Sequence, residues 1–186
     1  MRIAVLAVQG AFIEHEQMLT SLGAECIELR KKEDLEKDYD ALVLPGGEST
    51  VQRKLLHELD MFQTIQNMIM NGIPTLATCA GLILLSEEIN GEEDVCFGTL
   101  PVSVKRNAYG RQLGSFQKEA YLEGIGDFNM TFIRAPYIES VKEGVSVLAT
   151  VDDKIVAAQY KNQIGMAFHP ELGNDTRLHK YFLGLL

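Results

Sequence analysis

Short aliphatic runs alternate with amphipathic segments along the first half of the chain. The amphipathic segments place apolar residues three or four positions apart, which is the period of a helix with one buried face. The first stops at Gly23, and the second covers 51–69 behind a capping box expected from Ser49 and Gln52. The aliphatic runs predict buried strands at 3–8, 25–29, 41–44 and 73–78.

After residue 90 the pattern changes to short β-like runs separated by turn residues, which predicts an antiparallel extension. One hairpin is expected at 151–155, and Asn174 or Asp175 can cap a last helix that runs through Leu186. The whole pattern predicts one domain over 1–186. Its expected fold is a three-layer αβα arrangement around a flavodoxin-like, mostly parallel sheet. The later runs lie at 99–104, 131–133, 145–151, 155–160 and 164–168.

Composition narrows the class of protein. The chain has 186 residues, of which 46% are hydrophobic, so it can bury one substantial core. Its net charge of −9 provides no basic stripe for nucleic acid or an anionic membrane surface. The three cysteines are widely spaced, and the apolar run 3–8 is too short for a signal peptide or a membrane span. These features indicate a cytoplasmic protein that binds neither nucleic acid nor membrane.

Cys79 lies between a predicted strand and a helix-compatible run. Small residues flank it, with Ala77 two positions before and Gly81 two positions after. A nucleophile elbow needs this arrangement, because its sharp turn brings neighbouring backbones close together. The start of a helix also favours the thiolate form. The alternative is a buried structural cysteine, and this stretch alone does not decide between the two.

His169, Pro170 and Glu171 follow another apolar strand. In an extended segment, residues two apart point to the same side, so the Glu171 carboxylate could hold the His169 ring. Pro170 favours the extended conformation at His169. A histidine base held by an acid is what a cysteine nucleophile requires, although the same residues could also form an ordinary strand exit.

The segment 44–50, LPGGEST, follows the third predicted strand. Its two glycines could turn backbone N–H groups toward a ligand and form an oxyanion hole, although a glycine turn without a ligand is the alternative. The three features all follow strands of one expected parallel sheet. Because such sheets bind ligands at the carboxyl ends of their strands, they predict one shared site.

Several segments together resemble the class I, or triad, glutamine amidotransferases. The cysteine elbow and the His-x-Glu pattern mark this class. Three further segments resemble the glutaminase subfamily that serves pyridoxal 5′-phosphate synthases: VQGAFIEH at 8–15, KRNAYGRQLGSF at 105–116 and FIRAPYI at 132–138. Two positions depart from the wider class, because Ala77 stands where glycine is common and Leu82 where glutamine is common.

The resemblance implies hydrolysis of L-glutamine to glutamate and ammonia, without a metal or an organic cofactor. It implies that the partner is a pyridoxal 5′-phosphate synthase subunit that consumes the ammonia. It makes Cys79 the nucleophile, His169 the base and Glu171 the orienting acid. The remaining implied residues are Gly47 and Ala80 for the oxyanion hole, and Gly47, Glu48, Ser49, Arg106, Ile133 and Arg134 around bound glutamine.

Other readings stay open. The chain could serve a different synthase, act as a γ-glutamyl hydrolase, or be a non-catalytic scaffold with the same fold. Gln9 is expected to border the active site or the partner surface, or simply to end a strand. No catalytic role is expected for His15, His57 or His179, because histidines on predicted helices are usually satisfied within the fold or solvated.

Overall fold

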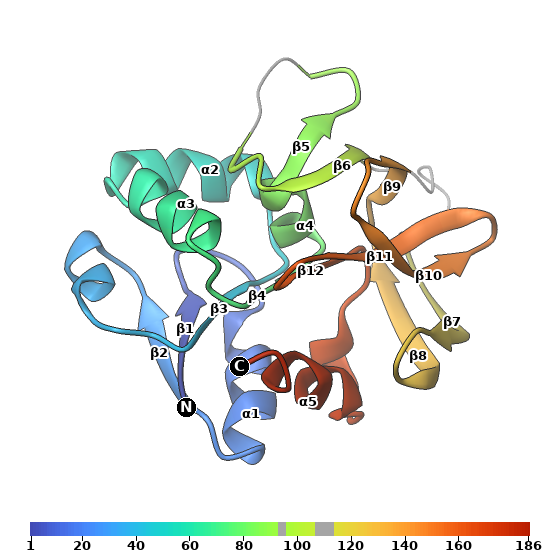
Figure 1. Ribbon diagram of the computed structural model, residues 1–186, viewed down its shortest axis with the longest axis horizontal. Helices are drawn as coiled ribbons and strands as arrows, with labels where there is room; N and C mark the ends of the chain where they lie inside the picture. The colour runs from blue at the N-terminus through green and yellow to red at the C-terminus, as the bar shows by residue number, and fades with distance from the viewer. Residues whose placement is uncertain (93–95, 107–113) are drawn as a thin grey trace.

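The computed structural model describes residues 1–92, 96–106 and 114–186, and within them a ten-stranded mixed sheet forms the centre of the molecule. Helices cover both faces of this sheet (Figure 1). The strand order is β2-β1-β3-β4-β12-β11-β9-β6-β5, with β10 paired to β11. The expectation of a layered α/β fold is confirmed.

One half of the sheet consists of five parallel strands. They are β2 (Glu25–Leu29), β1 (Arg2–Leu6), β3 (Ala41–Leu44), β4 (Thr75–Thr78) and β12 (Gln163–Met166). Every residue of β3, β4 and β12 is buried, because both faces of these central strands are covered. Their carboxyl ends therefore meet at one edge of the sheet.

The other half is mostly antiparallel, as expected. The β10–β11 hairpin turns through Asp152 and Asp153 at φ of 48° and 60°, which suits a two-residue turn between twisted strands. The sequence reading missed β5, β7 and β9. The strands of this half are β5 (Ser86–Ile89), β6 (Leu100–Lys105), β9 (Tyr137–Val141), β10 (Ser146–Val151) and β11 (Lys154–Tyr160). Among the described residues, β7 (Ser115–Leu122) and β8 (Gly126–Ile133) form a separate two-stranded antiparallel sheet.

The helices divide between the two faces of the sheet (Figure 1). On one face lie α1 (Phe12–Ser21) and α5 (Arg177–Leu183). On the other face lie α2 (Ser49–Glu58), α3 (Phe62–Met70) and α4 (Ala80–Leu85). Two short 3₁₀ turns complete the elements, η1 (Lys32–Glu36) and η2 (Pro170–Leu172).

Two expectations about the helices are wrong. The stripe at 51–69 forms two helices, because Asp60 adopts a positive φ of 53° and ends the first one. The capping box is absent, since Ser49 is already the first residue of α2 and makes no cap hydrogen bond. The Gln52 side chain instead donates to the carbonyl oxygens of Gln9 and Pro45. It thereby ties the end of β1 to the loop after β3.

The last helix is shorter than expected. It ends at Leu183 and has Thr176 at its N-cap, and Asp175 accepts a hydrogen bond from the Arg177 N–H at 3.0 Å.

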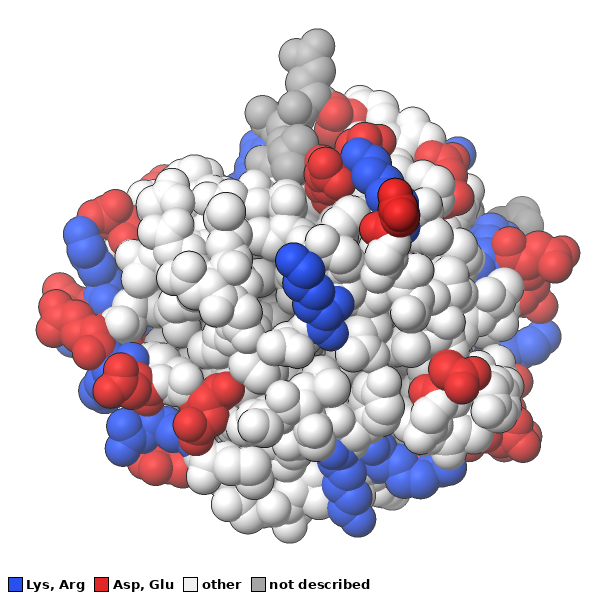
Figure 2. Space-filling view, viewed as in Figure 1, with Lys and Arg blue, Asp and Glu red and all other residues white. Residues whose placement is uncertain are grey.

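Charged side chains lie mainly around the rim of the face shown in Figure 2, with acidic and basic groups interspersed. Much of the centre of this face is uncharged, and the described residues form no continuous basic stripe there. In the described part of the chain, no helix is both long enough and apolar enough to cross a membrane.

Candidate active site

Cys79 occupies a strained turn between β4 and α4. Its φ is 49°, a left-handed value that non-glycine residues rarely adopt, and its N–H donates to the Met166 carbonyl of β12 at 2.8 Å. The turn is possible only because Gly81 has no side chain, since a Cβ there would lie 2.0 Å from the Leu44 carbonyl oxygen. The glycine at position 81 therefore lets α4 approach β3 closely. This geometry is that of the expected elbow.

His169 and Glu171 lie beside this turn, after β12. The His169 Nδ1 is 2.7 Å from Oε1 of Glu171, and both side chains are buried. The expected contact is therefore present, but its backbone explanation is wrong. Pro170 begins the 3₁₀ turn η2, so Glu171 reaches the ring across a tight turn and not along an extended strand.

Electrostatics links these three side chains. Burial alone would lower the pKa of His169, but hydrogen bonds to Cys79 and Glu171 outweigh it and raise this pKa to about 10. Burial alone would raise the pKa of Glu171, but His15 and His169 hold it below its usual range. The arrangement thus favours the charged imidazolium form of His169, held by the ionised Glu171 carboxylate.

The loop after β3 approaches the same point. The Gly46 N–H donates to Oγ1 of Thr78 at 3.0 Å, and the Gly46 carbonyl accepts from the Ala11 N–H at 2.9 Å. Gly47 packs against Gln9, whose Oε1 accepts the Glu48 N–H at 2.8 Å. Gln9 therefore borders the site and holds the loop.

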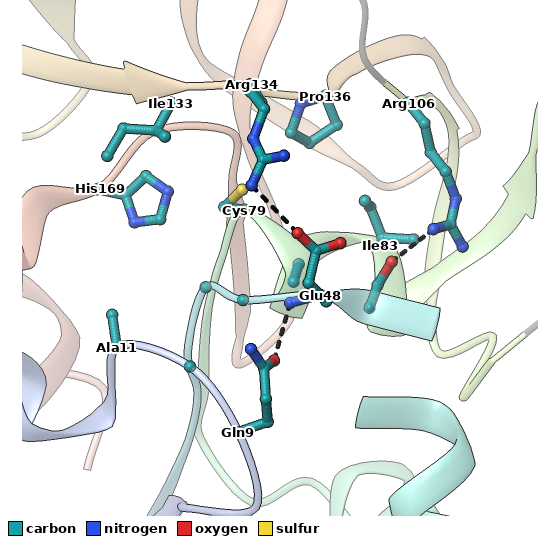
Figure 3. A pocket seen from close by; sticks show the side chains of 15 residues that line it. Gln9, Ala11, Glu48, Cys79, Ile83, Arg106, Ile133, Arg134, Pro136 and His169 are labelled. Carbon is teal, nitrogen blue, oxygen red and sulfur yellow. Dashed lines mark hydrogen bonds and ion pairs between the residues drawn. The ribbon is translucent and has the colours of Figure 1, made fainter. Parts of the chain in front are cut away.

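A cavity of about 390 Å³ opens at this edge of the sheet (Figure 3). Arg134 and Glu48 point toward each other across it, with 3.2 Å between Nη2 and Oε1. Arg106 donates to Oγ of Ser49 at 2.7 Å. The expected residues that line the cavity are Gly47, Glu48, Ser49, Cys79, Ala80, Arg106, Ile133, Arg134 and His169.

Glu171 and the segment that contains Arg106 differ from the other expected positions. Glu171 lies behind His169 and does not line the cavity. Arg106 belongs to the quoted segment 105–116, of which 107–113 lie outside the described residues.

The sequence reading missed a buried polar group on the far side of Glu171. His15 from α1, His179 from α5 and Thr78 from β4 meet there, and all three are fully buried. The expectation that a helix histidine is satisfied within the fold holds for His15, whereas Nδ1 of the buried His179 has no hydrogen-bond partner among the described residues and His57 is exposed. The signal that could have found this group was a histidine on the apolar stripe of the first helix.

Comparisons with known proteins agree on one family. The model of the SNO glutamine amidotransferase family matches residues 5–185. A relative from Desulfitobacterium hafniense, named pyridoxal 5′-phosphate synthase subunit PdxT, is 61% identical over 98% of this chain and 92% of its own length. A relative from Streptococcus pneumoniae with the same name is 52% identical over 100% of this chain and 97% of its own length.

Solved structures give the same answer for the fold. A crystal structure described as a glutamine amidotransferase matches with a TM-score of 0.93 and 44% identity, covering 98% of this chain and 97% of that one. The PurLQS structure from Thermotoga maritima matches with a TM-score of 0.72 at 15% identity, covering 98% and 97%, which supports the fold alone. By sequence and by fold, the chain belongs to the SNO glutamine amidotransferase family.

Proposed function

We propose that this chain is the glutaminase subunit of a pyridoxal 5′-phosphate synthase. It hydrolyses L-glutamine to L-glutamate and ammonia, and the synthase subunit consumes the ammonia. One observation carries the proposal: Cys79, on its strained turn, lines the same cavity as His169, whose Nδ1 is held by Glu171 at 2.7 Å. The names of the relatives in Desulfitobacterium hafniense and Streptococcus pneumoniae support the choice of synthase.

The proposed reaction has two halves. In the first, His169 Nε2 takes the proton from Sγ of Cys79, and the thiolate attacks the side-chain carbonyl carbon of glutamine. His169 then returns this proton to the leaving nitrogen, and ammonia departs as a γ-glutamyl thioester forms on Cys79. In the second half, His169 takes a proton from water as the water attacks the thioester. Collapse of that intermediate returns the proton to sulfur and releases glutamate.

Backbone N–H groups of Gly47 and Ala80 would stabilise the oxyanion in both halves. Both residues line the cavity, and Ala80 is the first residue of α4. Donors fixed before reaction are effective because they need no reorganisation when charge develops. Glu171 stays ionised and orients the His169 ring without exchanging a proton, as the acid of a serine-protease triad does.

The cavity suits a free amino acid. Its volume of about 390 Å³ lies near the lower end of the roughly 300 to 1,000 Å³ typical of small-molecule sites. Arg106 and Arg134 can bind the α-carboxylate of glutamine, and Glu48 can accept hydrogen bonds from its α-ammonium group. Ser49 and Ile133 complete the wall. The Arg134–Glu48 pair would open to admit these charges.

A partner that receives ammonia must dock over the opening of the cavity. Large apolar side chains are exposed on the elements around that opening: Ile13 at 52%, Val51 at 44%, Ile133 at 37% and Leu172 at 44%. These side chains could contribute apolar contacts to a docked partner. A docked synthase would also keep ammonia from being protonated in water. We place the enzyme in the cytoplasm, since its three cysteines are all free.

The test is ammonia release from L-glutamine by the wild-type chain mixed with a synthase subunit. With no other substrate present for the synthase subunit, we expect glutamate and free ammonia in equal amounts, and no turnover by Cys79→Ala. Cys26→Ala is the matched control, because Cys26 lies on the opposite side of β1 from the cavity, on edge strand β2, and should leave turnover unchanged. Turnover by Cys79→Ala at the wild-type rate would disprove the proposal.

A further inference from the structure

A buried polar chain runs from Glu171 to the loop after β3 by way of His15. The Nε2 of His15 lies 3.4 Å from Oε2 of Glu171 and 3.1 Å from Oγ1 of Thr78. That same Thr78 oxygen accepts the Gly46 N–H at 3.0 Å. His15 therefore contacts both the carboxylate behind the His169 ring and the group that holds the Gly46 backbone.

The protonation of His15 follows from its surroundings. Burial lowers the pKa of His15 below its usual value, and burial likewise lowers the pKa of His179 to about 3, so both rings are neutral near pH 7. The Nδ1 of His15 lies 3.1 Å from Nε2 of His179. The charged or titratable groups that act on His15 are Glu171, His169, His179 and Glu14.

The donors and acceptors around His15 favour one of its two neutral tautomers. Oε2 of Glu171 is a buried acceptor without a well-aligned hydrogen bond among the described residues, and Nδ1 of His179 is buried without a partner there. If His15 carries its proton on Nε2, this proton faces Oε2 and Thr78, while Nδ1 accepts from His179. The partnerless His179 Nδ1 is then a bare acceptor. The opposite tautomer would bury an unpaired N–H and leave Oε2 facing a lone pair, which costs more.

We infer that His15 is a positioning residue for the proposed glutaminase reaction. Its Nε2–H fixes the rotation of the Glu171 carboxylate and, through Thr78, couples this carboxylate to the Gly46 backbone of the proposed oxyanion loop. The inference rests on the proposed function. The Oε1 atom of Glu171 already bonds His169, and the His15 Nε2 is the group that faces the other oxygen, at 3.4 Å. Without it, the carboxylate could rotate and the imidazolium would lose part of its stabilisation.

Two substitutions at His15 distinguish a role in positioning Glu171 from a role in packing the core. In His15→Asn the amide lies near the former Nδ1, so it can still reach His179 but not Glu171. In His15→Gln the amide lies near the former Nε2 and can still donate to Glu171 and Thr78. Histidine and asparagine have similar helix propensities, so α1 itself should tolerate the exchange. His57→Asn, on the exposed side of α2, is the matched control.

The first measurement is steady-state glutamine hydrolysis by each variant in complex with the synthase subunit. We expect His15→Asn to lower kcat roughly 10- to 100-fold, the loss that outer hydrogen-bond partners of a functional histidine cause in metal sites, with KM nearly unchanged. His15→Gln should recover most of this loss. Equal losses in both variants, accompanied by equal falls in melting temperature, would assign His15 to packing and overturn the inference.

The second measurement needs no glutamine. It therefore distinguishes a failure of this inference from a failure of the proposed function. The rate at which iodoacetamide alkylates Cys79 is followed against pH by peptide mass spectrometry. Because a loosened Glu171 stabilises the His169 imidazolium less, the thiolate should form at higher pH in His15→Asn than in wild type or His15→Gln. An unchanged midpoint in His15→Asn overturns the inference, even in a chain that proves not to hydrolyse glutamine.

Thr78 supplies an independent pair should His15→Asn fold poorly. Thr78→Ser keeps the hydroxyl group that joins His15 to Gly46, whereas Thr78→Val replaces it with a methyl group of similar shape. We expect Thr78→Val to lower kcat and Thr78→Ser to retain it. Equal kcat values for the two variants would contradict the coupling.

Discussion

Replacement of Gly46 by alanine would test how closely turnover depends on the position of the His169 ring. Gly46 contributes no reacting group, and its φ lies outside the positive region, so alanine fits its backbone conformation. The new Cβ would, however, lie 2.3 Å from Cε1 and 3.0 Å from Nδ1 of His169. It would also lie 3.4 Å from Cβ of Cys79. The perturbation is therefore a steric displacement directed mainly at one ring.

The size of the effect follows from these distances. Ordinary van der Waals contact begins near 3.4 Å, so the ring and the loop must separate by about 1 Å. Glu171 holds the ring, while Thr78 and Ala11 hold the loop, so neither side moves freely. A misplacement of about 1 Å from reactive geometry can cost roughly 10²-fold in rate. We expect kcat to fall about 100-fold.

The assay is glutamate production with the synthase subunit present, together with the melting temperature of each protein. KM should change little, because Arg106 and Arg134 lie on other elements. Gly114→Ala is the matched control, since a Cβ there meets no atom within 4 Å and no positive φ is involved. A folded Gly46→Ala protein with wild-type kcat would refute the reasoning, because the ring would then tolerate a displacement of this size.

Three further predictions concern other groups. Glu171→Gln should lower kcat by about 10³ to 10⁴ without abolishing it, because the acid orients His169 but does not react; a wild-type rate in a steady-state assay would exclude this role. On acidification, the unfolded chain protonates His179 near pH 6.5 while the folded pKa is about 3, so stability is lost as pH falls through this window. The loss at pH 5 should be about 2 kcal/mol, measured by urea unfolding, and His179→Asn should flatten this dependence. The chain alone should turn over glutamine poorly and be activated by the synthase subunit, because the direction of the Gly47 N–H depends only on the Gly46–Ala11 hydrogen bond and the contact of Gly47 with Gln9, which a docked partner can rearrange. One misdirected oxyanion donor costs about 10² to 10³ in rate, and an equal kcat with and without partner would contradict this.

The local pattern of apolar residues was sufficient to predict the strands in the parallel half of the sheet. Strands buried on both faces are continuous aliphatic runs, so β2 and β3 were bounded correctly from the sequence. The convergence of Cys79, His169 and the loop at 44–50 also followed, since parallel strands end at a common edge. By contrast, β5, β7 and β9 were missed. The exposed β7 and the edge strand β5 carry charged or polar residues, so their apolar signal is weak.

Turns were less predictable than strands because neighbouring elements decide them. Pro170 was expected to hold His169 extended, and His169 is indeed non-helical with a φ of −111°, but the chain folds into η2 directly after it, so Glu171 is not in an extended segment. Both conformations satisfy the fixed φ of proline, and packing selects the tighter one. Likewise, the apolar stripe at 51–69 is continuous in sequence, but Asp60 breaks it so that α3 changes direction.

The sequence by itself predicted which residues carry the proposed chemistry, because a thiol, an imidazole and a carboxylate each stand directly after a strand or within a turn of it. Only the tertiary structure decided what lies behind them. His15 and His179 are 164 residues apart and lie on helices whose periodicity says only that one face is buried. Packing of α1 and α5 against the same face of the sheet brings the His15 ring to Glu171 and the His179 ring to His15, and no local pattern predicts these contacts. Side chains far apart in the chain become neighbours only when the sheet and its covering helices have formed.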